Sequence, residues 1–195
     1  MEYRELKISG AFEILPRKFG DERGVFLEWF KQETFIDAAG TSFPLAQANC
    51  SVSAAGVLRG IHYADVPPGQ AKYVTCVSGA VFDVVVDLRM GSPTFGQWDS
   101  VVLDERDRRA VFLPEGLGHG FMALEEQSTV VYLCSTSYDP DNEHEINPLD
   151  ETIDIDWPTI SPSGAPLKHL LSEKDRNAPS FITMRDAGSL PQWTY

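Results

Sequence analysis

The feature that most constrains this chain is a series of short apolar segments separated by glycine and proline turns. Many short strands at spacings of roughly 8–12 residues are typical of β-sandwiches, barrels and jelly rolls. We therefore predict an all-β core over about residues 11–137. The expected strands are 11–15, 25–30, 43–53, 57–62, 71–77, 80–88, 97–103, 110–113, 120–124 and 128–137.

Three short segments show helical patterns, one between the expected strands 25–30 and 43–53 and two beyond the β core. One short helix is expected over residues 31–39, ended by Gly40, and two more over 172–177 and 180–187. The proline-rich, acidic segment before the last two helices reads as irregular structure that wraps the core. A separate domain with so little apolar content would be marginal, so we expect one domain, 1–195, with a C-terminal extension of about 138–195.

Composition narrows the classes of partner. The chain has 16 Lys and Arg against 29 Asp and Glu, a net charge of −13. That charge argues against nucleic acid or an anionic membrane as a partner, and an anionic ligand would need a local positive pocket. The start has no apolar signal core, and the longest apolar run is too short to span a bilayer. Cys50, Cys76 and Cys134 show no paired spacing, so we expect buried free thiols in a cytoplasmic protein.

Residues 57–72 carry the densest group of chemically useful side chains. Arg59, His62 and Lys72 lie within fourteen residues, among apolar and turn-forming neighbours. Two cations around a group that titrates near neutrality suit an anionic substrate that gains or loses a proton.

Two motifs resemble those of the cupin jelly roll. Gly56 is followed after five residues by His62, and Pro114, Gly116 and His119 match most of the second cupin motif. The resemblance implies a double-stranded β-helix whose strands enclose a pocket.

Metal-binding cupins have further ligands that this chain lacks. Their second histidine and their glutamate correspond here to Ala64 and to Pro68 or Gly69, none of which can bind a metal. His62 and His119 alone do not make a metal site. We therefore expect no metal, and proton transfer by side chains instead.

Strand alternation identifies further candidates. Lys72 shares a face with Val74 and Cys76, and a lysine on such a face needs an anion near its ammonium group. Tyr132 lies among the apolar positions of its own strand, where it is either a hydrogen-bonded core residue or a phenol acid.

A histidine base works best with a carboxylate partner, which spacing alone does not identify. Asp83 is one candidate, although alternation leaves open which way it faces. Asp175 is another, although Ser172 three residues before it favours a helix-capping role.

Longer segments resemble the dTDP-4-dehydrorhamnose 3,5-epimerase family across almost the whole chain. The matching pieces are DERGVFLEWF, QANCSVS, GVLRGIHY, PPGQAKYVTCVSGAVFDVVVDLR, GSPTFGQW, LPEGLGHGF, YLCSTSYDP, IDWP and LSEKD. The resemblance implies a cupin-like jelly roll, a homodimer, and no metal or organic cofactor.

The resemblance also implies roles for individual residues. His62 becomes the general base with Asp175 as its partner, Lys72 the cation beside the sugar C4 oxygen, and Tyr132 the acid. The implied nucleotide-sugar contacts are Arg23, Glu28, Gln47, Asn49, Arg59, His119, Glu143 and Lys174.

The implied reaction is epimerisation of dTDP-4-dehydro-6-deoxy-D-glucose at C3 and C5 through an enolate, giving dTDP-4-dehydro-L-rhamnose. One alternative within the family inverts C3 alone, as in antibiotic deoxysugar pathways. Alternatives of other classes are a metal-dependent cupin enzyme and a non-catalytic module that binds sugar nucleotides.

Overall fold

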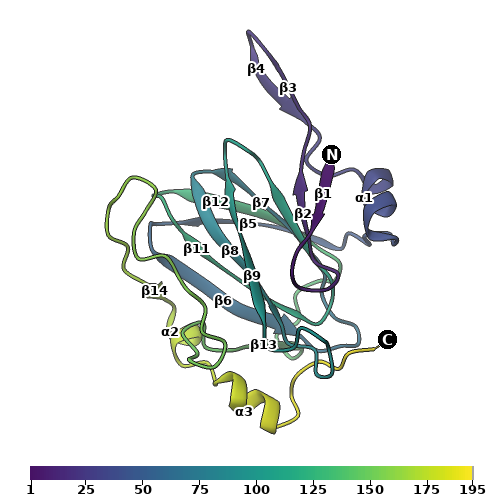
Figure 1. Cartoon of the computed structure of the whole chain (residues 1–195), viewed down its shortest axis with the longest axis vertical. Helices are drawn as coiled ribbons and strands as arrows, with labels where there is room; N and C mark the ends of the chain where they lie inside the picture. The colour runs from purple at the N-terminus through teal and green to yellow at the C-terminus, as the bar shows by residue number, and fades with distance from the viewer. Residues whose placement is uncertain (195) are drawn as a thin grey trace.

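Two antiparallel sheets face each other in the computed structural model, which describes residues 1–194 (Figure 1). We name the sheet of strand order β1-β2-β10-β7-β12-β5 sheet I and the sheet of order β13-β6-β11-β8-β9 sheet II. Sheet I is built from β1 (Glu2–Glu5), β2 (Phe12–Leu15), β10 (Ala110–Leu113), β7 (Lys72–Ser78), β12 (Ser128–Cys134) and β5 (Gln47–Ser53). Sheet II is built from β13 (Glu143–Glu145), β6 (Val57–Ala64), β11 (Leu117–Ala123), β8 (Ala80–Asp87) and β9 (Trp98–Asp104), with β14 (Leu170–Leu171) parallel to β6. We call the two sheets together the barrel.

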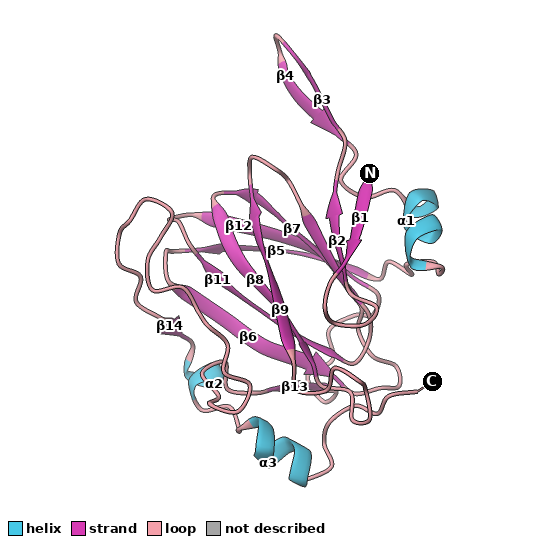
Figure 2. Cartoon of the chain, viewed as in Figure 1, coloured by secondary structure: helices cyan, strands magenta, loops and turns pink. Residues whose placement is uncertain are grey.

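Helices are short and lie outside the barrel, as Figure 2 shows. They are α1 (Gln32–Ala39), α2 (Glu173–Arg176) and α3 (Phe181–Asp186). Gly40 ends α1 in the left-handed conformation, as its position in the sequence predicts. The predicted all-β jelly-roll class is confirmed.

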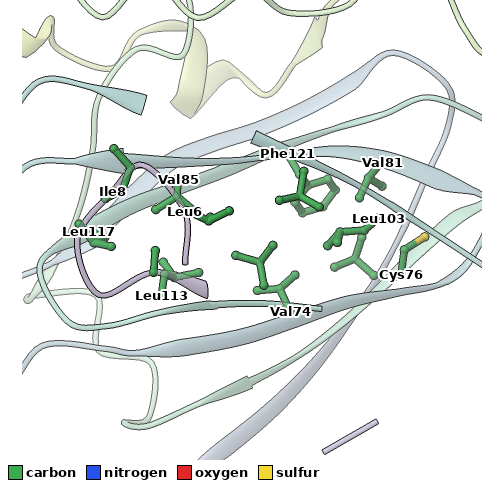
Figure 3. Close-up of a cluster of buried hydrophobic side chains, with 14 residues drawn as sticks. Leu6, Ile8, Val74, Cys76, Val81, Val85, Leu103, Leu113, Leu117 and Phe121 are labelled. Carbon is green, nitrogen blue, oxygen red and sulfur yellow. The ribbon is translucent and has the colours of Figure 1, made fainter. Parts of the chain in front are cut away.

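Apolar side chains of both sheets meet in the barrel interior (Figure 3). Val74 and Cys76 of β7 point there, as do Val81 and Val85 of β8 and Phe121 of β11. Alternate residues of β8 instead face outward, where a second layer covers them. The strand is therefore buried on both faces, which explains its nearly continuous apolar sequence.

The C-terminal extension supplies the layer over sheet II. Its residues Ile146, Trp157 and Phe181 are buried against Leu58 and Val84 of the sheet. Helix α1 and the loop after it cover part of sheet I in the same way. These apolar contacts hold the C-terminal extension against sheet II, next to β6.

A hairpin of β3 (Lys18–Asp21) and β4 (Gly24–Leu27), which we call the arm, projects away from the barrel (Figure 1). Of the strand expected over residues 25–30, only the part up to Leu27 is β-strand, and the strand β3 before it was not predicted. Phe19 pairs with Phe26 across the hairpin, with ring centroids 6.5 Å apart. Both rings stay largely exposed, so this pairing stabilises the arm only locally.

Other boundaries also differ from expectation. The strand expected over 43–53 begins at Gln47, the strand expected over 128–137 ends at Cys134, and β1, β13 and β14 were not predicted.

Cys76 and Cys134 are buried free thiols, but Cys50 is exposed. It lies on the outer face of the edge strand β5, beside the exposed Val52. The expectation of three buried thiols is therefore corrected.

No helix in residues 1–194 is long and apolar enough to cross a membrane. The cytoplasmic location stays a prediction.

Strands β6 and β11 approach each other closely at Gly60. Gly60 has φ +117°, and a Cβ built on it would lie 2.6 Å from Gly120 Cα and 2.7 Å from the His119 carbonyl oxygen. Because both contacts are backbone, G60A should lower the free energy of unfolding by roughly 2–4 kcal/mol, measured by chemical denaturation. Gly164 also has positive φ but nothing within 4 Å, so G164A should cost only about 1 kcal/mol. Equal costs for the two variants would contradict this account of the strand contact.

Candidate active site

A cavity of about 320 Å³ opens at one end of the barrel. Both sheets and the C-terminal extension contribute to its wall, so segments far apart in the sequence meet there. The lining residues are Gln47, Asn49, Arg59, His62, Gln70, Lys72, Tyr132, Tyr138, Glu143, His144, Ser172, Lys174 and Asp175.

A β-bulge explains how two residues of β6 both reach this cavity. Residues three apart on a regular strand point to opposite faces. On β6, however, Arg59 pairs with Phe121 and His62 with His119, so three steps on β6 match two on β11. The extra residue restarts the alternation and turns both Arg59 and His62 towards the cavity, while Ile61 is buried under the C-terminal extension.

His62 is paired with a carboxylate from the C-terminal extension. Its Nε2 lies 2.8 Å from Oδ1 of Asp175, 113 residues further along the chain. The Ser172 hydroxyl donates to the other carboxylate oxygen at 2.8 Å and also accepts from the Asp175 backbone N–H, capping α2. Asp175 therefore takes part in the helix cap through its backbone N–H and in the histidine contact through its carboxylate, which the capping motif alone did not reveal.

Electrostatics fix the roles of this pair. Burial alone would raise the pKa of Asp175, but hydrogen bonds from His62 and Ser172 outweigh it and hold that pKa below its ordinary value. The ionised carboxylate accepts the His62 Nε2–H, so Nδ1 is the ring nitrogen that carries the lone pair. The arrangement leaves His62 able to take a proton through Nδ1.

Lys72 lies on the opposing sheet with its side chain inside the barrel. The residue is 8% exposed, and within residues 1–194 its ammonium group makes no hydrogen bond or ion pair. Burial lowers the pKa of Lys72, while the negative charges of Glu143, Cys134 and Asp83 act in the opposite direction. An unpaired, desolvated ammonium group beside a cavity is suited to bind an oxyanion.

Tyr132 lines the same cavity from β12 of sheet I. Burial raises the pKa of its phenol, and the charges of Cys134 and Glu143 add to the rise. The phenol is therefore protonated at neutral pH and can donate a proton. Gln47 and Asn49 stand beside it on β5, joined by a 2.9 Å hydrogen bond between their amides.

Two charged side chains of the cavity wall, Glu143 and Lys174, are held by neighbouring side chains. The Gln70 amide donates to Glu143 at 3.3 Å, and Lys174 forms a 3.0 Å ion pair with Glu145. That hydrogen-bonded ion pair raises the pKa of Lys174. Gln70, Tyr138, His144 and Ser172 were missed as cavity residues from the sequence. Only Gln70 carried a usable signal, because it stands two residues before Lys72.

Three predicted contacts lie outside the cavity. His119 is buried beside it, where its Nε2 lies 2.9 Å from Oδ2 of Asp83. Arg23 and Glu28 belong to the exposed end and base of the arm, and Arg23 donates to Asp21 rather than facing the cavity. Within one chain the structure does not bring these two residues to the other site residues.

A larger hollow of about 790 Å³ lies elsewhere, between α1, β10 and the C-terminal end. Of the described residues that line it, Arg89 and Glu115 are charged, and Arg89 is held by the Asp87 carboxylate. Its described lining residues include no histidine, lysine or tyrosine, so size alone does not mark it as the reactive site.

The geometry defines a class of protein. A jelly roll holds a histidine–carboxylate pair on one sheet and a lysine and a tyrosine on the other, around one cavity. In residues 1–194 no three His, Cys, Asp or Glu side chains are grouped to hold a metal ion. These features describe an acid–base site for a substrate that develops negative charge.

Comparison with known proteins identifies the family. Residues 5–183 match the family model described as dTDP-4-dehydrorhamnose 3,5-epimerase. A protein of that name from Mycolicibacterium smegmatis is 55% identical over 99% of this chain and 92% of its own length. A dTDP-4-dehydrorhamnose 3-epimerase from Streptomyces niveus is 54% identical over 99% of this chain and 90% of its own. The chain belongs to the dTDP-4-dehydrorhamnose 3,5-epimerase family, which confirms the resemblance and the isomerase class.

Solved structures agree. The rmlC epimerase of Mycobacterium tuberculosis superposes with a TM-score of 0.94 at 55% identity, covering 99% of this chain and 94% of that one. An epimerase from Legionella pneumophila, solved in complex with dTDP-4-keto-L-rhamnose, superposes with a TM-score of 0.90 at 37% identity, covering 100% of this chain and 99% of that one.

The Asp175 environment predicts a pH-dependent stability effect. A carboxylate whose folded pKa is lowered stabilises the fold above its ordinary pKa of 3.8, and this contribution is lost as the pH falls through the folded value. D175N should therefore destabilise the protein by roughly 1–3 kcal/mol at pH 7, and by less near pH 3. Denaturant titrations at the two pH values test this, with the exposed Asp186→Asn as control. A cost that does not change with pH would contradict it.

Proposed function

We propose that this protein epimerises dTDP-4-dehydro-6-deoxy-D-glucose at C3 and C5, giving dTDP-4-dehydro-L-rhamnose. The observation that carries the proposal is the His62–Asp175 pair on the wall opposite Tyr132, with the unpaired Lys72 in the same cavity. The family match and the ligand in the Legionella pneumophila structure support the substrate class. The chain is proposed to act as one epimerase domain, 1–195.

Each side chain has a distinct part in the proposed mechanism. Protons at C3 and C5 are acidic because the C4 carbonyl takes the electron pair when either proton leaves. Nδ1 of His62 removes the proton, and the Lys72 ammonium stabilises the enolate oxygen at C4. Tyr132 then donates a proton to the other face of the ring. Because base and acid stand on opposing sheets, a ring between them is inverted.

Cations at the cavity account for binding of the diphosphate. Arg59 and Lys174 line the cavity and provide local positive charge on a chain of net charge −13. Arginine donates to phosphate in a forked geometry, which favours Arg59 as one contact. Gln47, Asn49 and Glu143 are proposed to bind the sugar or the base, as the resemblance implies.

We further propose that the protein is a homodimer in which the arm of one copy reaches the cavity of the other. On the arm, the side chains of Phe19, Val25 and Phe26 are 47%, 63% and 66% exposed and form an apolar surface patch. The outer face of sheet I also exposes Val52 and Val77. A second copy that covers these surfaces would stabilise the arm and bring Arg23 and Glu28 to a cavity.

Solvent-isotope exchange tests the reaction. Incubation of the enzyme with the dTDP-4-keto sugar in D₂O should place deuterium at both C3 and C5, detected by NMR. Deuterium at C3 alone would select the C3-only alternative, which the 54% identical Streptomyces niveus protein makes a specific competitor. Exchange at neither carbon would overturn the proposal.

Variants separate the base from the acid within this assay. H62N should lower both exchange and inversion by about 10²–10⁴-fold while still binding dTDP. Y132F should slow inversion by a similar factor but keep exchange, because His62 can return deuterium to the face it deprotonated. His169 and Tyr63 lie outside the cavity, so H169N and Y63F serve as matched controls. A non-catalytic binding module would show no response to H62N.

Mixed dimers test the arm. R23A and H62N should each be inactive or nearly so, whereas refolding the two together should restore activity. In the mixed dimer one cavity combines an intact His62 with an intact Arg23 from the other copy. If the arm served its own cavity, mixing would restore nothing, and a monomer in sedimentation analysis would also refute the proposal.

A further inference from the structure

A carboxylate lies inside the apolar barrel below the cavity. Asp83 of β8 points inward between Val81 and Val85 and is 1% exposed. Its Oδ2 accepts from His119 Nε2 at 2.9 Å, while its Oδ1 is buried without a hydrogen-bond partner among the described residues. Burying a carboxylate with one of its two oxygens lacking a hydrogen bond costs free energy. The position of Asp83 therefore calls for a reason beyond packing.

Holding β8 and β11 together is not that reason. The backbones of the two strands already pair at seven successive positions, from Leu117 with Asp87 to Ala123 with Val81. Buried polar pairs are often replaceable by apolar side chains without loss of stability. The side-chain pair of Asp83 and His119 therefore adds little to a contact that the ladder secures.

Charges around Lys72 supply a reason. Its ammonium group is buried, lacks a direct partner within residues 1–194, and shares the cavity with two further cations, Arg59 and Lys174. The groups that oppose its loss of a proton are Glu143 of β13, Cys134 of β12 and Asp83 of β8. The remaining titratable groups around the cavity are His62, Tyr132, Tyr138, His144 and Asp175, with His119 beside it.

Asp83 differs from the other two groups in being fixed. Glu143 is at the rim, half-buried and held through Gln70, where an incoming substrate can displace it. Burial raises the pKa of Cys134, so its thiol is neutral near pH 7 and acts as a negative charge on its neighbours only after it loses its proton at higher pH. Asp83 stays in place on a central strand, oriented by His119.

We infer that Asp83 is a positioning residue, whose buried carboxylate keeps the Lys72 ammonium group charged beside the reacting C4 oxygen. The inference rests on the proposed function, since it assigns a task to Lys72 in that reaction. His119 donates its Nε2–H to the Asp83 carboxylate and so fixes the carboxylate relative to β11. On β11, His119 lies directly opposite His62 of β6.

The test replaces the carboxylate with a neutral residue of the same shape. D83N can still accept a hydrogen bond from His119 but carries no charge. The titration of Lys72 is followed by NMR in protein labelled with ¹³C at the lysine ε carbon, its signal assigned by its absence in K72R. In D83N the Lys72 midpoint should move to lower pH, and the alkaline limb of kcat should move with it. KM should change less than kcat.

Controls separate charge from structure. Asp99 lies on the neighbouring strand β9, where its carboxylate accepts from the Lys7 backbone outside the barrel interior. D99N should leave both curves in place. If D83N does not fold, Asp83→Ser carries the same expectation with a smaller neutral side chain.

A folded D83N or D83S with unchanged Lys72 titration and unchanged alkaline limb would overturn the inference. The NMR titration needs no substrate, so it is independent of the reaction assigned above. Failure of the wild-type protein to exchange deuterium would overturn the proposed function instead, and the two failures are distinguishable.

Discussion

The hydrogen bond between His62 and Asp175 ties the barrel to the C-terminal extension, and the site depends on it. It joins residues 113 positions apart at 2.8 Å. Apolar packing of the extension on sheet II, the short parallel strand β14 beside β6, and the Ser172 cap of α2 all act to deliver Asp175 to that position. The extension is thus a structural requirement of the base rather than a cover added to a finished barrel.

A second constraint is the bulge in β6. Without the extra residue, Arg59 and His62 would face opposite sides of sheet II, and no cavity could use both. Gly60 and Gly120 make the bulge possible, because the two strands approach so closely that a Cβ at either position meets backbone or Ile61. Local backbone geometry, rather than sequence proximity, makes these two residues neighbours in function.

Sequence patterns predicted the barrel strands because apolar alternation and glycine turns are local signals. They also predicted that Lys72 and Tyr132 face inward, since alternation along one strand needs no knowledge of its partners. The position of Asp175 depends on tertiary packing, and only the family resemblance paired it with His62. The arm was misread because Gly20 and Gly24, which are typical of turns, lie within its strands. Cys50 was misjudged because strand composition does not say whether another layer covers the strand.

Charge placement unifies these elements. A chain of net charge −13 keeps cations at one cavity, and its buried Lys72 makes no ion pair within residues 1–194.

The central claim is that the C4 oxygen of a keto sugar meets the Lys72 ammonium group between His62 and Tyr132. A crystal structure of H62N with dTDP-4-dehydro-6-deoxy-D-glucose tests it most directly. The account predicts the C4 oxygen about 3 Å from Lys72 Nζ, with residue 62 and Tyr132 on opposite faces of the ring. A ring bound away from Lys72, or with both side chains on one face, would contradict it.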